Sequence, residues 1–309
     1  MKDNWTKVLG VLAVLTLLLA ACAPPAAEEP EEAPAAAEAY TLGLSLSTLN
    51  NPFFVTLKEG AEEAADAAGV TLVVVDSQDD PATEATNMED LIQQGVDAIL
   101  VNPTDADAIV PSIQKANEAG IPVFTIDRAA AGGDIVSHIA SDNVAGGRMA
   151  AEFLCNLLDG RGNVVELEGI AGTSAARDRG QGFNDYMSNN CPAVEIVARQ
   201  TANFNRAEGL GVFENILQAQ PEINGVFAHN DEMILGAIEA AEAAGRTEMV
   251  FVGFDAIDDA VAAVNAGKLA ATVAQQPSEM GRLGVEFAIK YLNGESVDEY
   301  VPVDLALVQ

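Results

Sequence analysis

The sequence predicts an α/β fold with two similar lobes, each built on an open, mostly parallel sheet with helices on both faces. From Tyr40 onward, short apolar runs rich in β-branched residues alternate with longer segments whose apolar residues repeat at helical spacing. Runs such as 71–75 are apolar without interruption, which is typical of parallel strands covered on both faces. Eleven such runs are many for one sheet, so we expect two sheets, with a break near 139–143.

The expected elements follow one another regularly along the chain. In the first helix, Phe54, Leu57 and Ala61 share one face, and Glu62 lies toward the other. Gly69 then acts as a helix stop. The expected helices lie at about 53–68, 83–94, 106–119, 144–159, 175–189, 206–219, 231–244, 257–267 and 278–293. The expected strands are 41–47, 71–76, 98–102, 122–127, 135–140, 163–168, 194–200, 225–229, 249–254, 270–274 and 303–308.

Composition excludes some classes of function. The 309 residues carry 15 Lys and Arg against 47 Asp and Glu, which gives a formal net charge of −32. Nucleic-acid binding depends on basic patches that pair with phosphate, so this chain is not expected to bind nucleic acid. The 49% of hydrophobic residues is normal for a globular protein.

The first 22 residues read as an export signal. Lys2 and Lys7 precede an apolar stretch, 8–21, that is too short to span a membrane comfortably. The stretch ends in Leu-Ala-Ala-Cys, which resembles the lipobox of bacterial lipoproteins, so Cys22 is expected to carry a lipid anchor. The alternative is an ordinary signal peptide with an incidental cysteine. Either way, we expect an exported protein, and with the lipid it would be held at the membrane surface.

Residues 23–39 are expected to be a disordered acidic tether. This segment contains only Ala, Pro and Glu, with no aromatic or branched side chain that could form a core. The folded body would then begin near Tyr40.

Two cysteines remain in the body of the chain. Export permits a disulfide between Cys155 and Cys191, and two separate buried thiols are the alternative. The chain has no CxxC motif and no Cys/His cluster, so we expect no metal site.

Polar residues follow successive predicted strands. Ligands of open parallel sheets bind beyond the carboxyl ends of the strands. Carboxylates accept hydrogen bonds, guanidinium groups donate several, and amides do both, while aromatic faces add an apolar wall. A sugar needs all of these, whereas no nucleotide motif such as GxGxxG or GxxxxGK[ST] is present. The residues at these ends are Asn50 to Phe54, Asn102 to Asp105, Asp127 and Arg128, Arg177 to Arg179, Asn203 to Asn205, Asn230 and Asp231, Asp255 and Gln275.

Each of these residues also has an ordinary structural explanation. Asp127 and Arg128 would form a surface ion pair. Phe53 would simply be core, and Asn230 would cap a helix. Only their shared position at successive strand ends favours a ligand cleft.

Residues 40–309 closely resemble the ribose-binding proteins of bacterial ABC importers, within the type I periplasmic binding proteins. The resemblance covers the whole body. It is carried by the segments 47–54 (STLNNPFF), 102–105 (NPTD), 126–128 (IDR), 137–143 (SHIASDN), 170–180 (IAGTSAARDRG), 230–233 (NDEM), 252–255 (VGFD) and 267–275 (GKLAATVAQ).

The resemblance implies a fold and a ligand set. The family's ribose contacts match eleven of these strand-end residues without departure, and the resemblance implies that they bind the sugar: Asn51, Phe53, Phe54, Asn102, Asp127, Arg128, Arg179, Phe204, Asn230, Asp255 and Gln275. It also implies a hinge at three crossings, near 141–143, 275–277 and 303–304. One lobe would then be 40–141 plus 276–303, and the other 142–275 plus 304–309. D-ribose would bind between them, and the protein, a monomer without cofactor, would deliver it to an ABC permease with separate ATPase subunits.

Two other classes of function, a glycosidase and a repressor, fit the sequence less well. A glycosidase could use Asp127 and Asp255, but the neighbouring arginines are expected to keep both carboxylates ionised, without the protonated acid that hydrolysis needs. His138 and His229 form no Ser-His-Asp pattern, and both are expected to be structural. A repressor would need a basic DNA-binding segment in place of the acidic tether. A binding protein for another pentose or hexose, or a ribose sensor for a chemoreceptor, remains an alternative.

Overall fold

The computed structural model describes residues 40–309, so the expected signal segment, the tether and Cys22 lie outside the described residues. Within this range the strands form two sheets of six strands each. The first sheet has the order β11-β5-β4-β3-β1-β2 and is parallel throughout. Its strands are β1 (Thr41–Leu46), β2 (Thr71–Asp76), β3 (Ala98–Val101), β4 (Val123–Ile126), β5 (Ile135–Ser141) and β11 (Tyr300–Val303).

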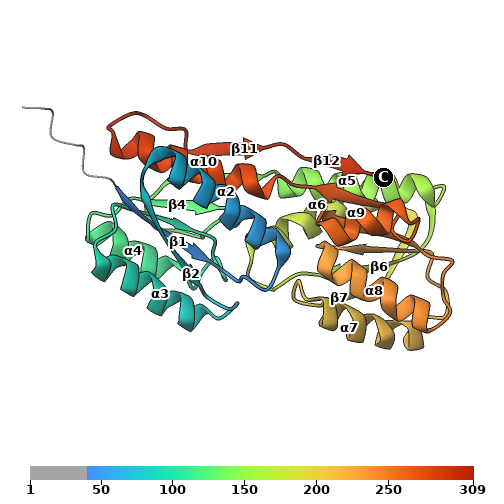
Figure 1. Cartoon of the computed structure of the whole chain (residues 1–309). Coiled ribbons are helices and arrows are strands. Elements are labelled where there is room, and N and C mark those ends of the chain that lie inside the picture. The colour runs from blue at the N-terminus through green and yellow to red at the C-terminus, as the bar shows by residue number, and fades with distance from the viewer. Residues whose placement is uncertain (1–39) are drawn as a thin grey trace, which may run out of the picture. The chain divides into compact units, whose positions relative to one another are not determined.

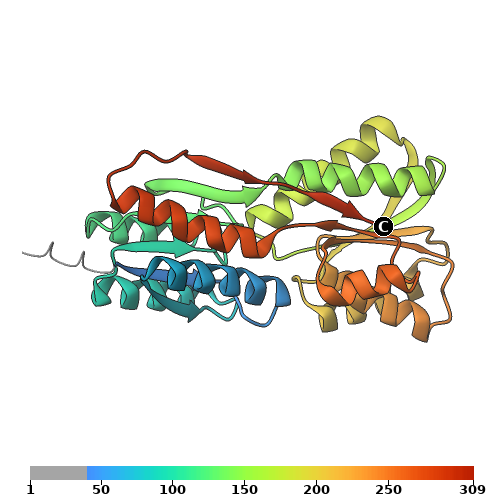
Figure 2. The same cartoon turned by 45° about the horizontal axis from the view of Figure 1, so that its top comes forward.

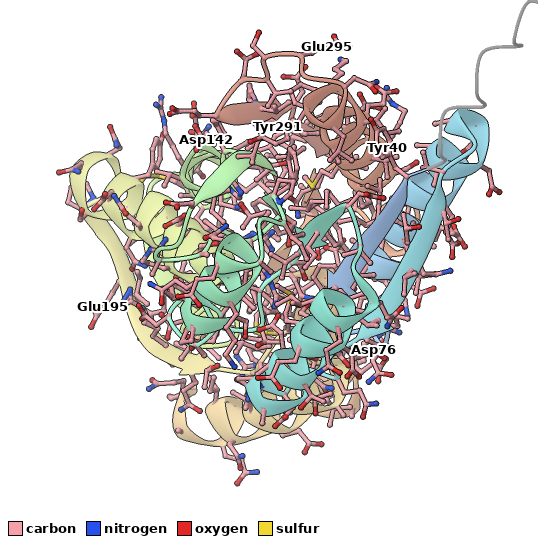
Figure 3. The ribbon with its side chains drawn as sticks, turned by 90° about the vertical axis from the view of Figure 1, so that its left-hand side faces the viewer. Tyr40, Asp76, Asp142, Glu195, Tyr291 and Glu295 are labelled. Atoms are coloured by element: carbon pink, nitrogen blue, oxygen red, sulfur yellow. A yellow bond between two sulfur atoms is a disulfide. The ribbon has the colours of Figure 1, made fainter. Side chains whose placement is uncertain are left out.

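The second sheet repeats this arrangement in the order β12-β10-β9-β8-β6-β7. It is parallel except at β12, which runs antiparallel to β10. Its outer edge is β7, where Glu195 points outward (Figure 3). The strands are β6 (Arg161–Glu168), β7 (Ala193–Thr201), β8 (Gly225–Ala228), β9 (Val250–Asp255), β10 (Ala271–Ala274) and β12 (Ala306–Val308).

Helices cover both faces of each sheet (Figures 1 and 2). The first lobe consists of the first sheet with α2 (Pro52–Ala68) and α10 (Pro277–Leu292) on one face and α3 (Pro81–Gln94) and α4 (Val110–Glu118) on the other. The second lobe consists of the second sheet with α5 (Asn143–Leu157) and α6 (Ser174–Asn190) on one face. Its other face carries α7 (Arg206–Ala219), α8 (Asp231–Ala243) and α9 (Asp258–Asn265).

The predicted fold class is confirmed, and one predicted strand is corrected. The apolar run 303–308 is not a single strand, because β11 ends at Val303 in the first sheet and β12 begins at Ala306 in the second. The chain therefore crosses between the sheets at 304–305. It also crosses after β5 and after β10. The helix expected at 106–119 is shorter, since α4 begins at Val110.

Helix starts place residues at the strand ends. Asn51 caps α2 by accepting a hydrogen bond from the Phe53 amide at 3.0 Å, and Pro52 takes the first helical position. The helix ends at Gly69, whose φ of 69° lies in the left-handed region that favours glycine. The cap thus holds Asn51, Phe53 and Phe54 beside the end of β1.

Two glycines bring α5 and α6 into direct backbone contact. A Cβ on Gly147 would lie 2.0 Å from the carbonyl oxygen of Arg179, and one on Gly182 would lie 2.0 Å from that of Val144. Only glycine permits this approach. The close contact fixes the backbone of Arg179 against α5.

A disulfide joins the same two helices near their other ends. Cys155 in α5 and Cys191, directly after α6, form the bond, with their Cα atoms 6.4 Å apart. Both residues are buried.

Removing this disulfide should destabilise the protein. The bond closes a loop with a sequence separation of 36 residues, and chain entropy predicts that its loss lowers the free energy of unfolding by about 3–4 kcal/mol. Denaturant unfolding of the Cys155→Ser/Cys191→Ser variant measures this loss, and reductant should weaken the parent protein but leave the variant unchanged. Equal stability of the two proteins under oxidising conditions would contradict the prediction.

No helix of the described range, 40–309, is long and apolar enough to cross a membrane.

Candidate ligand-binding site

The carboxyl ends of strands from both lobes surround one small pocket. Its free volume is about 10 Å³, roughly the room of one water molecule, so the lining side chains lie close together. Ten of the eleven predicted residues line it. Ala175, in the first turn of α6, also lines the pocket and carried no signal in the sequence. The lining is Asn51, Phe53, Phe54, Asp127, Arg128, Ala175, Arg179, Phe204, Asn230, Asp255 and Gln275.

Asn102 is the predicted residue that does not line the pocket. Its Nδ2 donates to Asp127 Oδ2 at 3.1 Å and to the Ile126 carbonyl at 3.0 Å. Its Oδ1 accepts from the Ser47 hydroxyl at 2.7 Å. The structure therefore places Asn102 behind Asp127, where it orients that carboxylate.

Aromatic side chains from both lobes form the pocket walls. Phe53 and Phe54 of the first lobe meet edge to face at 5.1 Å, and Phe204 comes from the second lobe. The Arg128 guanidinium carbon lies 5.1 Å from the ring centroid of Phe54 and 5.3 Å from that of Phe204. Such cation–π contacts hold a dehydrated cation against apolar surface.

Arg179 is held on several sides. Its Nε donates to Asn143 Oδ1 at 2.8 Å, and its Nη1 donates to the His229 carbonyl at 2.6 Å. The guanidinium also lies 3.9 Å from the ring centroid of Phe254 and 3.4 Å from Asp255 Oδ1. With its position set in this way, the side chain is preorganised for a polar ligand.

Burial dominates the electrostatics of the pocket carboxylates. Burial raises the pKa of Asp255 to about 7, although Arg179 and a 2.8 Å hydrogen bond from Gln275 Nε2 act in the opposite direction. Burial also raises the pKa of Asp127, against the effect of Arg128 and Arg179. Asp231 lies behind Asp255, and burial together with the charge of Asp255 raises its pKa well above the ordinary value.

This finding corrects one expectation from the sequence. The arginines were expected to favour the ionised carboxylates, and they do act to lower both pKa values, but burial raises these pKa values by more. The ion pair of Asp127 and Arg128 is also not on the surface, since both residues are 3% exposed.

Several buried polar atoms of the pocket have no hydrogen-bond partner within the described part of the protein. They are Asp127 Oδ1, Arg128 Nε and Gln275 Oε1; the other two such atoms in residues 40–309 are hydroxyl oxygens of Ser137 and Ser141. Buried polar atoms are nearly always paired in native proteins. Two acceptors and one donor in the same pocket therefore match the hydrogen-bonding capacity of hydroxyl groups.

Backbone conformations of low occurrence also gather at the pocket. Asp127, Phe204 and Asp255 have φ values of 61°, 56° and 118°. Residues other than glycine seldom adopt these values, and they cluster at functional sites.

The two lobes also contact each other directly beside the pocket. The Ala106 amide donates to the Gly172 carbonyl at 3.1 Å, and the Ala129 amide donates to the Ser174 hydroxyl at 2.8 Å. The pocket residues of both lobes are thus held close to one another.

Glu84 supports the site from α3 and was not predicted. Its carboxylate accepts from the Thr104 amide at 3.0 Å and from the Thr104 hydroxyl at 2.7 Å. These bonds hold the loop after β3, whose Pro103 carbonyl accepts from Arg128 Nη1 at 3.3 Å. The sequence did contain a signal, because Glu84 shares the buried face of α3 with Met88 and Leu91.

Residues 40–309 contain no group of three or more His, Cys, Asp or Glu side chains that could hold a metal ion.

Comparison with known proteins identifies the family. A model of the periplasmic binding protein domain matches residues 42–296. The chain belongs to the periplasmic binding protein family. This family implies an exported protein.

Curated members of the family include close relatives of this chain. The ribose import binding protein RbsB of Escherichia coli K12 is 50% identical over 87% of this chain and 90% of its own length. The protein of the same name from Bacillus subtilis 168 is 46% identical over 97% of this chain and 98% of its own length. These relatives are transport proteins rather than enzymes, which rules against a glycosidase.

Solved structures of periplasmic binding proteins share this fold. A solute-binding protein from Bacillus halodurans with bound myo-inositol is 33% identical, with a TM-score of 0.83, over 87% of this chain and 94% of that one. One from Actinobacillus succinogenes with bound D-allose is 34% identical, with a TM-score of 0.82, over 87% and 97%.

Glu84 should make stability depend on pH. Burial raises its pKa from 4.5 to about 7, so between these values the folded state binds a proton that the unfolded state does not. The free energy of unfolding therefore falls as pH rises through this window, by roughly 3 kcal/mol at 1.36 kcal/mol per pKa unit.

In the Glu84→Gln variant an amide that does not titrate replaces the carboxyl group, so this variant is the matched control. Denaturant unfolding at pH 4.5 and at pH 7.5 should show the parent protein losing stability relative to the variant. Titration of Asp255 and the other acids is common to both proteins and cancels in the difference. Parallel pH profiles would show that Glu84 does not titrate in this range.

Proposed function

We propose that this protein binds D-ribose between its two lobes and delivers it to the permease of an ABC importer. The observation that carries the proposal is the set of unpaired polar atoms on Asp127, Arg128 and Gln275, enclosed by aromatic faces. A pyranose or furanose hydroxyl both donates and accepts, and the C–H face of a sugar ring suits an aromatic wall.

Ribose, rather than sugars in general, is supported by the relatives. The relatives named for ribose import share 46–50% of their residues with this chain, whereas the structures with D-allose or myo-inositol share 33–34%. All eleven residues of the expected ribose-contact set are also present. Another pentose or a hexose is the alternative that the ligand test below distinguishes.

Binding would close a hinge between the lobes. We place the lobes at 40–141 plus 276–303 and 142–275 plus 304–309, with the hinge at the three chain crossings. Because the pocket takes residues from both lobes, ribose would make contacts in the closed form that the open form lacks, and so shift the population toward closure. A permease would then recognise the closed form.

The N-terminal segment would hold the protein at the membrane. In this proposal Cys22 carries the lipid, and the acidic tether 23–39 lets a monomeric body reach the permease. A role as ribose sensor for a chemoreceptor uses the same closure, and binding to a receptor instead of the permease would distinguish it.

Arg179 and Asp255 should be required for affinity. Either Arg179→Ala or Asp255→Ala leaves buried partners unpaired, at a cost of about 1–3 kcal/mol or more, so ribose binding should weaken by at least roughly tenfold. Isothermal titration measures the change. Arg177→Ala is the matched control, since Arg177 lies one half-turn earlier in α6 and points to the surface, where it pairs with Asp178. Unchanged affinity in either pocket variant would remove that residue from the site.

Calorimetric unfolding of the sugar-free protein, with each of a panel of monosaccharides added in turn, should identify the ligand. A ligand at a hundredfold excess over Kd adds about 2.7 kcal/mol of stability, a shift of a few degrees in Tm. Ribose should raise Tm well above the other sugars. A clear shift with another sugar and none with ribose would keep the transport function and overturn the assignment of ribose.

A further inference from the structure

A buried histidine and glutamate lie behind the pocket in the second lobe, and neither lines it. Glu166 is in β6, and His229 directly follows β8. Both are almost fully buried, and His229 Nε2 lies 2.9 Å from Glu166 Oε1. Burying two ionisable groups is costly unless they are well paired, so their partners are informative.

The hydrogen bonds assign the proton of His229. The Gly169 amide donates to His229 Nδ1 at 3.3 Å, so this nitrogen is an acceptor. The proton therefore resides on Nε2 and is donated to Glu166. Glu166 also accepts from Arg199 Nε at 2.8 Å and from Asn184 Nδ2 at 3.0 Å. Burial raises the pKa of Glu166, but the hydrogen bonds from His229 and Arg199 and the charge of Arg199 outweigh it, so its pKa is lowered.

Two contacts connect this pair to the pocket. The main-chain carbonyl of His229 accepts the 2.6 Å hydrogen bond from Arg179 Nη1. Gly169, held by the His229 ring, lies directly against Phe204, because a Cβ at Gly169 would be 2.1 Å from the Phe204 Cζ. A shift of the His229 side chain would therefore displace both the Arg179 guanidinium and the Phe204 ring.

We propose that Glu166 and His229 are positioning residues for sugar binding, which hold Arg179 and Phe204 in the geometry that the ligand requires. The proposal rests on the proposed function of the pocket. His229 acts through its fixed Nε2–H tautomer: one ring nitrogen is anchored on the buried carboxylate, and the other holds the loop that begins at Gly169.

The first test substitutes the histidine. In His229→Leu the imidazole is lost, and affinity for the sugar that most stabilises the parent protein should fall by about tenfold. In His229→Gln the amide can still accept from Gly169 and donate to Glu166, so affinity should stay within about threefold. His138→Gln is the control, since His138 lies in the first lobe and bonds Thr125. Equal losses in the Leu and Gln variants, or no loss in either, would overturn the proposal.

A double-mutant cycle separates positioning from a general loss of packing. If His229 acts through Arg179, then His229→Leu should weaken binding much less in an Arg179→Lys background than in the parent protein. Equal, additive effects in both backgrounds would contradict the mechanism. Glu166→Gln, which keeps the side-chain size, should reduce affinity and couple to Arg179→Lys in the same way. This variant replaces His229→Leu in the cycle if His229→Leu fails to fold.

Nitrogen NMR tests the pair without any sugar. The chain has 2 histidines, and His229→Gln identifies the signals of His229. They should show a neutral ring with its proton on Nε2, and the Arg179 Nε–H signal should move in His229→Leu but not in His229→Gln. The proposed role of Glu166 and His229 would be refuted by a proton on Nδ1 of His229, or by an Arg179 Nε–H signal that is unchanged in both variants. This holds even if the parent protein bound no ribose. Failure of the parent protein to bind any sugar would instead refute the proposed function.

Discussion

The structure depends on how four charged side chains are kept out of water between the lobes. Asp127, Arg128, Arg179 and Asp255 are all buried. Dehydration raises the pKa of both carboxyls, so their neighbours must compensate. Amides, main-chain carbonyls and aromatic faces supply most of this compensation. The polar atoms left without partners on Asp127, Arg128 and Gln275 belong to residues that line one small pocket.

The fold brings these groups together because each follows a strand or begins a helix. Parallel strands end at the same edge of each sheet, and the three chain crossings turn the two edges toward each other. Helix caps such as Asn51 and Asn230 then have two roles, since each accepts a main-chain amide hydrogen bond and also lines the pocket. The expected structural explanation of Asn230 as a cap was therefore correct, and it did not exclude a place in the site.

The sequence was sufficient for the fold class and for a set of strand-end residues that must meet at one edge, and the resemblance to ribose-binding proteins narrowed that set to most of the lining. It could not show the direction of side chains, so it did not reveal that Asn102 turns to Asp127. The sequence also could not show whether burial or the arginine charges have the larger effect on the pKa of Asp127 and Asp255, because that comparison requires the depth of burial. The split of 303–308 was missed because one apolar run can serve two sheets. The pairing of Cys155 with Cys191 required the distance between their Cα atoms, and the link from Glu166 through His229 joins residues 63 positions apart.

The central claim is that a sugar completes the hydrogen bonding of the pocket. A crystal structure of the protein with ribose tests it most directly. The account predicts that ribose hydroxyls lie within hydrogen-bond distance of Asp127 Oδ1, Arg128 Nε and Gln275 Oε1, with the ring between Phe54 and Phe204. Ribose bound elsewhere, or bound here with these atoms still unpaired, would contradict it.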